Sequence, residues 1–298
     1  MYRKSLSHSL FLVMVLIGGL FSFAACGDDE KEDGGTSPSA TEADGGGGEI
    51  DISGVQELED GALTIGSDIA YAPIEYFEEG TDTAVGMDVD LAKAMAEVLG
   101  VEVEFEQVAD FGGILGDLST RRYDIIMSAI SITPEREAEI DFVAYFGPVG
   151  TGILAEAGNP EGFSSVEDLC GKSVGAQAGT FQVEQMETLN QDTCAADSQI
   201  DIQTFPDNPT VVEELGLGRL DAALMDDPVA AYSEDQSEGG LIELVVPGFE
   251  AAPYGIGVRK DSTGLKAVLE EALQAIRDSG EYDRILEDWG QSDFALAE

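Results

Sequence analysis

Two successive runs of alternating strand-like and helix-like segments constrain the fold of this chain most. In the first run, apolar segments at residues 63–66, 101–105 and 124–129 alternate with helical patterns at 89–99 and 113–120. In the second run, strand-like segments at 173–176, 200–205 and 220–225 alternate with helices beginning at Thr180 and at Asn208 and Pro209. Because strands joined through helices pair in parallel, each run predicts an open α/β sheet. Asp88 is expected to cap the helix at 89–99, and Asp227 the helix that begins at Pro228.

The C-terminal part of the chain is too small to form a third domain. A strand at residues 254–258 is followed only by amphipathic helices at 263–278 and 281–289. These elements must pack on an earlier unit. We therefore expect an inserted second lobe, residues 151–252.

The first lobe would then be discontinuous, with residues 61–150 and 253–298. Two crossing segments, near residues 146–154 and 246–253, would connect the lobes. Two strands make a hinge that bends without letting the lobes separate.

The acidic excess of the chain restricts its partners. There are 60 Asp and Glu residues against 14 Lys and Arg residues, which gives a formal net charge of -46. Such a surface repels nucleic acid, so we expect no nucleic-acid partner. The excess fits a salt-rich habitat, where ions screen self-repulsion, or a requirement for solubility alone.

The single histidine, His8, lies in a segment that we expect to be removed. The mature chain would then contain no histidine. This excludes Ser-His-Asp and Cys-His catalysis and histidine-ligated zinc or copper. We expect neither a metal nor a cofactor.

The N-terminus has the features of an export signal, residues 1–25. Arg3 and Lys4 precede an apolar run at residues 10–20, which is too short for a good membrane span. The stretch Phe23-Ala24-Ala25-Cys26 resembles a bacterial lipobox, which implies cleavage before Cys26 and lipid modification of its thiol. Ordinary cleavage with an unmodified Cys26 is the alternative.

The segment that follows is rich in Gly, Asp, Glu, Ser and Thr, so residues 26–60 are expected to form a lipidated, disordered tether. The protein would then lie on the outer face of the cell membrane. In that oxidising compartment, a disulfide between Cys170 and Cys194 is favoured over two buried free thiols.

Several short motifs share one resemblance. They are residues 86–91 (GMDVDL), 123–128 (YDIIMS), 131–136 (SITPER), 140–142 (IDF), 179–180 (GT) and 224–226 (LMD). Through them the chain resembles the amino-acid-binding family (family 3) of bacterial extracellular solute-binding proteins of ABC importers, in its lipoprotein form. The resemblance extends from about residue 63 to about residue 289.

The resemblance implies a two-lobed α/β fold of the type II periplasmic-binding-protein kind. Each lobe would be an open, mostly parallel sheet flanked by helices, with a two-strand hinge. A monomer would bind a free amino acid between closing lobes and deliver it to the permease of an ABC importer.

The motifs also imply ligand contacts. Arg136 would clamp the ligand carboxylate together with Ser131 and the backbone amides of Gly179 and Thr180. A guanidinium matches a carboxylate in two hydrogen bonds, and the amides at a helix start also attract anions. The alternative for Arg136 is a surface ion pair.

Asp226 and Ser128 would bind the ligand ammonium. The resemblance implies that Tyr71 and Phe111 sandwich the ligand side chain and that Asp68 meets its distal end. Gln177 and Met225 are expected on the far side of the pocket. Two alternative functions remain open: a ligand sensor for a separate membrane signalling protein, and a dehydratase-type enzyme with Glu75 or Glu106 as its acid.

Arg136 and Asp226 together favour plain amino-acid binding and not an enzyme, since they satisfy both charged ends of the ligand. A polar or cationic ligand side chain is favoured, because the acidic surface would steer a cation to the site.

Overall fold

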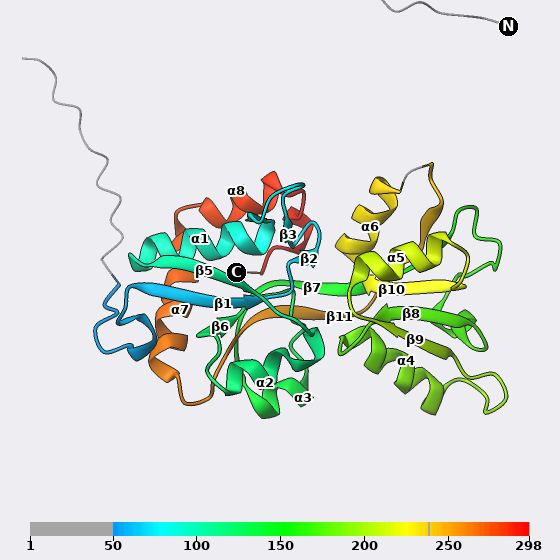
Figure 1. The fold of residues 1–298 in the computed structure, drawn as a ribbon, viewed down its shortest axis with the longest axis horizontal. Helices are drawn as coiled ribbons and strands as arrows, with labels where there is room; N and C mark the ends of the chain where they lie inside the picture. Colours follow the sequence, from blue (N-terminus) through cyan, green and yellow to red (C-terminus); the bar gives the residue numbers. More distant parts are fainter. Residues whose placement is uncertain (1–49, 238, 298) are drawn as a thin grey trace, which may run out of the picture. The chain divides into compact units, whose positions relative to one another are not determined.

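The strands and helices follow the expected alternation (Figure 1). The computed structural model describes residues 50–237 and 239–297, which all belong to one unit, Gly47–Glu298. The strands are β1 Ala62–Ser67, β2 Ala70–Tyr71, β3 Glu75–Phe77, β4 Ala84–Val85, β5 Glu102–Gln107, β6 Ile125–Ile126, β7 Asp141–Glu156, β8 Ser173–Gln177, β9 Asp201–Phe205, β10 Ala222–Asp226 and β11 Ile242–Val258.

The α-helices are α1 Met87–Leu99, α2 Ile114–Ser119, α3 Pro134–Glu139, α4 Phe181–Asp192, α5 Asn208–Gly216, α6 Asp227–Gln236, α7 Thr263–Asp278 and α8 Glu281–Asp288. The 3₁₀ turns are η1 Gln56–Leu58, η2 Phe111–Gly113, η3 Val166–Leu169 and η4 Ser292–Phe294.

Eight strands form one sheet in the order β5-β1-β6-β11-β7-β10-β8-β9. In the first parallel group, β1 pairs with β5 and β6, and in the second parallel group, β8 pairs with β9 and β10. Between the groups, β7 and β11 pair antiparallel with one another. The parallel pairing was predicted from the βα alternation, whereas the length of β7 and β11 was not.

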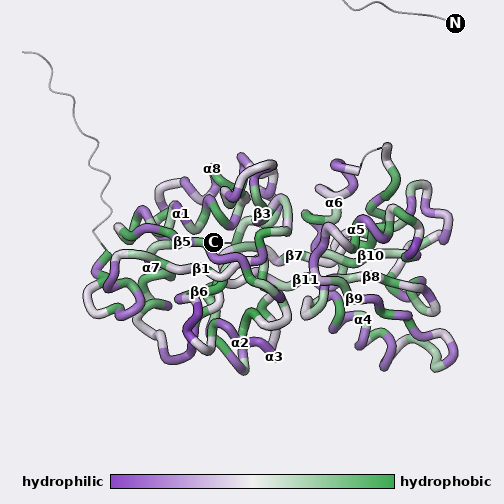
Figure 2. The backbone as a smooth tube through the Cα atoms, viewed as in Figure 1, coloured by the Kyte–Doolittle hydropathy of each residue, from purple (hydrophilic) through white to green (hydrophobic). Residues whose placement is uncertain are grey.

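Helices flank the strands of both parallel groups (Figure 1). Figure 2 shows hydrophobic positions recurring along the strands. All five residues of β10 are buried, as expected for a strand that is covered on both faces. The first parallel group packs through Leu63 and Ile65 of β1 against residues of α1 and α7.

The pairing between β7 and β11 is irregular in the middle. Their register shifts repeatedly between Leu244 and Gly255 of β11. The strands approach closely at two glycines, because a Cβ added to Gly150 would lie 2.5 Å from the carbonyl carbon of Gly248. This irregular stretch includes the crossing segments in which a hinge is expected.

The start of α1 differs from the prediction that Asp88 caps this helix. The N-cap is Gly86, with φ of 135°, and Asp88 lies inside the helix as a fully buried residue. Glycine is needed because a Cβ at residue 86 would lie 2.2 Å from the carbonyl oxygen of Ile74. Likewise α6 begins at Asp227, and its N-cap is Asp226.

The strand expected at residues 124–129 is only two residues long, Ile125–Ile126. It ends early because the chain turns at Ala129, whose φ is 48°, and then forms a single bridge from Ser131 to Tyr254. The serines of this segment therefore lie on a turn and not in the sheet.

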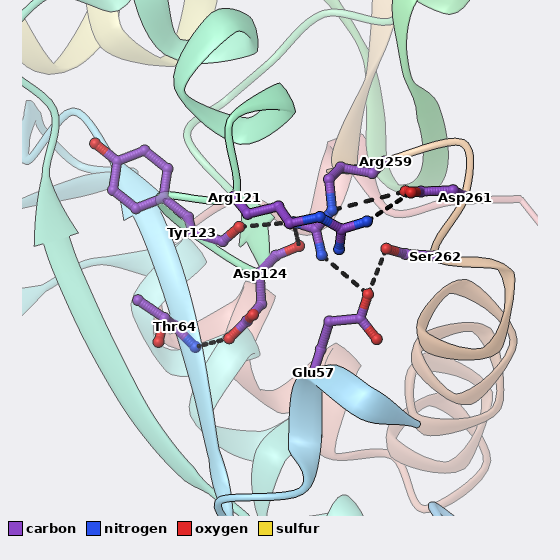
Figure 3. A network of polar contacts seen from close by, with 8 residues as sticks. All are labelled: Glu57, Thr64, Arg121, Tyr123, Asp124, Arg259, Asp261 and Ser262. Carbon is purple, nitrogen blue, oxygen red and sulfur yellow. Dashed lines mark hydrogen bonds and ion pairs between the residues drawn. The ribbon is translucent and has the colours of Figure 1, made fainter. Parts of the chain in front are cut away.

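The expected tether also differs from the structure between residues 50 and 60. Val55 and Leu58 are buried against the core, and Glu57 pairs with Arg259 at the end of β11 (Figure 3). The folded part of the chain therefore begins before residue 61. The expected signal peptide, the lipidation site Cys26 and the rest of the tether lie outside the described residues.

The predicted disulfide between Cys170 and Cys194 is confirmed. It joins the end of η3 to the segment that follows α4. In the described part of the chain, no helix is both long and apolar enough to cross a membrane.

Candidate functional site

A cavity lies where residues of both parallel groups meet. Its empty space, with the opening to solvent, is about 310 Å³. The lining residues are Asp68, Tyr71, Glu75, Phe111, Ser128, Ala129, Ser131, Arg136, Gln177, Thr180, Phe181, Gln182 and Asp226. Of the ten ligand-binding residues predicted, only Gly179 is not among them.

Arg136 is positioned by a short, well-defined helix start. Thr133 caps α3 by accepting a hydrogen bond from the Arg136 amide, and Pro134 occupies the first turn. The side chain is 7% exposed, and its guanidinium donates to the carbonyls of Ser131 (3.0 Å) and Gly179 (3.2 Å). Among the described residues no carboxylate pairs with it. Burial lowers the pKa of Arg136, but a guanidinium keeps its charge in proteins.

Asp226, at the end of β10, is the acid of the second parallel group in this cavity. One carboxylate oxygen accepts from the hydroxyls of Tyr71 (2.8 Å) and Tyr254 (2.7 Å), and the other accepts from the amide of Gln182 (2.7 Å). Burial raises the pKa of Asp226, although these hydrogen bonds favour its ionised form. A buried carboxylate held only by neutral donors can still receive a cation.

The N-terminus of α4 faces the same cavity. Thr180 is the N-cap residue, and its hydroxyl donates to the carbonyl of Gln177 at 2.7 Å. The first amides of a helix lack partners within the helix, so they can hold an anion. Gly179 has φ of 76°, and an added Cβ would lie 2.4 Å from the Cα of Gly112. Glycine thus permits the close approach of the loop that bears Phe111.

Asp68, which follows β1, lies at another wall of the cavity. Its carboxylate accepts from the amides of Gln177 (2.5 Å) and Gln107 (3.1 Å), and its backbone amide donates to the Ser128 hydroxyl. Burial raises the pKa of Asp68, while the two amides lower it. The position of Gln177 is fixed by Asn208, whose amide donates to its carbonyl oxygen at 2.7 Å.

Three further residues of the site were missed or only partly foreseen from the sequence. Gln182 and Tyr254 contact Asp226, and neither stands in a motif that could have revealed this. Glu75, considered only as an enzymatic acid, lines the cavity and accepts from Ser128 at 2.6 Å. Glu106, the other acid considered, lies exposed on β5.

The placement of Met225 at the far side of the pocket was wrong. Its side chain is buried in the hydrophobic core, because side chains alternate along a strand and that of Asp226 takes the opposite face. No group of three or more His, Cys, Asp or Glu side chains within the described residues could hold a metal ion.

Comparisons with known proteins agree with this fold. The family described as "Bacterial extracellular solute-binding proteins, family 3" matches residues 63–292. The arginine-binding extracellular protein ArtP of Bacillus subtilis is 32% identical over 231 residues, which cover 76% of this chain and 85% of that protein. The L-cystine-binding protein TcyJ of Escherichia coli is 28% identical over 236 residues, covering 79% and 85%.

A solved structure of an ancestral arginine-binding protein bound to arginine has a TM-score of 0.72 and 34% sequence identity. The match covers 77% of this chain and 98% of that one. The fold is therefore the two-lobed, type II periplasmic-binding-protein fold, and the relatives named are binding proteins and not enzymes. On these grounds, the chain belongs to family 3 of the bacterial extracellular solute-binding proteins.

Proposed function

We propose that this protein binds a free amino acid with a polar or cationic side chain in the cavity and delivers it to an ABC importer. One observation supports this most directly. Arg136 and Asp226 line the same cavity from different parallel groups, and neither forms an ion pair within the described residues. A buried cation and a buried anion, each without a counter-ion, match the two charged ends of a free amino acid.

The carboxylate of the ligand would bind at Arg136. The guanidinium offers two parallel donors once it leaves the carbonyls of Ser131 and Gly179. The hydroxyl of Ser131 and the first amides of α4, beginning at Gly179 and Thr180, would complete this side of the site.

The ammonium of the ligand would bind between Asp226 and Ser128. Asp226 supplies the negative charge, and Ser128 supplies a hydroxyl on the turn after β6. The ligand side chain would extend between Tyr71 and Phe111 toward Asp68 and Gln177. Because Asp68 is buried and has no cationic partner in the part of the chain that the structure describes, a polar or cationic side chain is favoured there.

Ligand binding would be coupled to closure of two lobes, residues 61–150 plus 253–298 and residues 151–252. Three contacts already join the parallel groups: Arg136 to Gly179, Tyr71 to Asp226 and Asp68 to Gln177. A ligand that touches both groups stabilises the closed form. The irregular pairing of β7 and β11 would serve as the hinge.

The cellular setting completes the proposal. Lipidation of Cys26 would attach the monomeric receptor to the outer face of the cell membrane, beside an importer permease. The relatives named above, which bind arginine and cystine, support an amino acid as the ligand.

A thermal-shift screen tests the proposal. The protein from Gly27 onward, which omits the lipidation site, is unfolded and refolded to remove carried-over ligand. It is then screened with the twenty amino acids at low and high salt. A ligand at 100 times its dissociation constant stabilises the fold by about 2.7 kcal/mol, so a selective rise in melting temperature is expected. No rise with any amino acid, in a folded sample, would overturn the proposal.

A further inference from the structure

Two fully buried acids lie near one another at the wall of the cavity: Glu75 in β3, which lines the cavity, and Asp88 in α1. The backbone holds them together, because the Asp88 amide donates to the carbonyl of Ile74 at 3.0 Å. Gly86 approaches so closely that an added Cβ would lie 2.9 Å from the Cα of Glu75. The start of α1 therefore brings the two residues close together.

Each acid uses one oxygen to hold the turn at residues 128–129. Glu75 Oε1 accepts the hydroxyl of Ser128 at 2.6 Å. Asp88 Oδ2 accepts the backbone amide of Ala129 at 3.1 Å and the hydroxyl of Tyr145 at 2.6 Å. The second oxygen of each, Glu75 Oε2 and Asp88 Oδ1, is buried without a hydrogen-bond partner among the described residues.

Within residues 50–237 and 239–297, neither acid forms an ion pair with a cation. The groups that face them are Asp68 after β1, Tyr71 on β2, Tyr145 on β7 and Asp226 on β10, which are all acidic or neutral. Arg136 lines the same cavity, but its guanidinium donates to the carbonyls of Ser131 and Gly179.

Two ionised carboxylates would be prohibitively unfavourable in this place. Burial first, and then the charge of Asp88, raise the pKa of Glu75 well above its ordinary range. Burial also raises the pKa of Asp88.

We propose that Glu75 and Asp88 together hold one proton at neutral pH, and that this pair positions the turn which binds the ligand ammonium. With one proton on the pair, only one of the two buried carboxyl groups carries a charge. The role of the turn in ligand binding rests on the proposed function, whereas the shared proton does not.

The pair acts on three lining residues. Ser128 donates to Glu75 and accepts from the backbone amide of Asp68 at 3.0 Å, so both residues are held through one hydroxyl. Ala129 has φ of 48°, a conformation that a non-glycine residue adopts only with support, and Asp88 supplies it. Loss of the shared proton would separate the two acids and release the turn. Glu75 and Asp88 are thus positioning residues.

The proton can be counted in ligand-free protein from urea unfolding between about pH 5 and about pH 8. A proton retained by the folded chain but lost by the unfolded chain raises the unfolding constant about tenfold per pH unit over that range. Glu75→Gln and Asp88→Asn each replace one carboxyl group of the pair with a neutral amide. In each single variant, the slope of the unfolding free energy against pH should correspond to one proton fewer than in the wild type. The double variant should also differ from the wild type by one proton only.

Two other outcomes would contradict the proposal that the acids share one proton. If both acids were protonated independently, the double variant would differ from the wild type by two protons. If both were ionised, the slope of the unfolding free energy against pH would be the same in every variant. Carboxyl ¹³C NMR of the wild type gives a second count if the double variant does not fold. One protonated carboxyl group across the two residues is expected, and two or none contradicts the proposal. Glu57→Gln is the control. The pKa of Glu57 is lowered, so its carboxyl group does not titrate in this range.

Calorimetric titration with L-arginine tests the positioning role. Glu75→Ala should weaken binding about tenfold or more, because Ser128 loses its acceptor, and Glu75→Gln should restore most of the loss. Wild-type affinity should also fall above neutral pH more steeply than that of Glu75→Gln. Equal losses in the Ala and Gln variants would overturn the positioning role. If the wild type did not bind arginine but showed the expected number of protons, the proposed ligand would be wrong. The proposal of a shared proton would still stand.

Discussion

The hydroxyl of Tyr71 donates a 2.8 Å hydrogen bond to Asp226, a residue 155 positions further along the chain. The same hydroxyl accepts a bond from the backbone amide of Asp226 at 3.1 Å. One side chain from β2 thus satisfies both a carboxylate and an amide at the end of β10. Tyr71, expected only to stack on a ligand, also links the two parallel groups across the cavity.

Tyr71→Phe should weaken amino-acid binding by about tenfold, equivalent to about 1.4 kcal/mol. The substitution keeps the aromatic face but removes one of the donors that fix the Asp226 carboxylate. Calorimetric titration with the amino acid selected by the thermal-shift screen measures the change. Tyr76→Phe, outside the cavity lining, is the matched control. If Tyr71→Phe bound the amino acid as tightly as the wild type, the Tyr71 hydroxyl would have no role in binding.

Arg136→Ala should reduce affinity by about 3–5 kcal/mol, because the buried ligand carboxylate would lose its partner. Arg136→Lys should recover only part of the loss, since an ammonium cannot form the paired donors of a guanidinium. Arg121→Ala provides the control, because Arg121 is exposed, pairs with Asp261, and does not line the cavity. Unchanged affinity in Arg136→Ala would rule out the carboxylate clamp.

Asp68→Asn distinguishes a cationic from a neutral ligand side chain. Removing the charge should weaken binding of L-arginine by about 1–3 kcal/mol and leave binding of L-glutamine nearly unchanged. The comparison of the two ligands by calorimetry cancels any general damage to the fold. Equal losses for both ligands would indicate that Asp68 supports the cavity without reading side-chain charge.

Glu57→Gln should destabilise the fold by about 1–3 kcal/mol near neutral pH without changing ligand affinity. Glu57 holds Arg259, and Arg259 donates to the carbonyl of Tyr123 just before β6 (Figure 3). Burial alone would raise the pKa of Glu57, but the hydrogen bonds from Ser262 and Arg259 outweigh it and lower the pKa.

Because the folded pKa of Glu57 is depressed, its stabilising effect is present above the ordinary glutamate pKa. That effect is lost as the pH falls through the lower, folded value. Urea unfolding in acidic buffers below pH 4.5, the ordinary glutamate pKa, should therefore show a fall in wild-type stability that is smaller in Glu57→Gln. Parallel curves for the two proteins would contradict this account.

Loss of the disulfide should cost about 3 kcal/mol of stability. Cys170 and Cys194 are 24 positions apart, and the bond restricts a loop of that length in the unfolded chain. Unfolding of the Cys170→Ala, Cys194→Ala double variant measures the cost. Ligand affinity should persist, since neither cysteine lines the cavity. A double variant as stable as the wild type would indicate that the loop is ordered without the bond.

The sequence by itself determined the α/β class, the parallel pairing of both groups and most residues of the cavity. Periodicity and turn residues act locally, so the helices and strands follow from neighbouring positions. Arg136 could be found because the motif at residues 131–136 indicates its role.

Only the tertiary structure decided which side chains converge. Asp88 looks like a helix cap in the sequence, yet the close approach of Gly86 to Ile74 moves it inside the fold against Glu75. The contacts of Asp226 with Gln182 and Tyr254 likewise depend on where separate elements meet. Burial and long-range pairing have no local signal, because they arise only when segments far apart in the chain pack together.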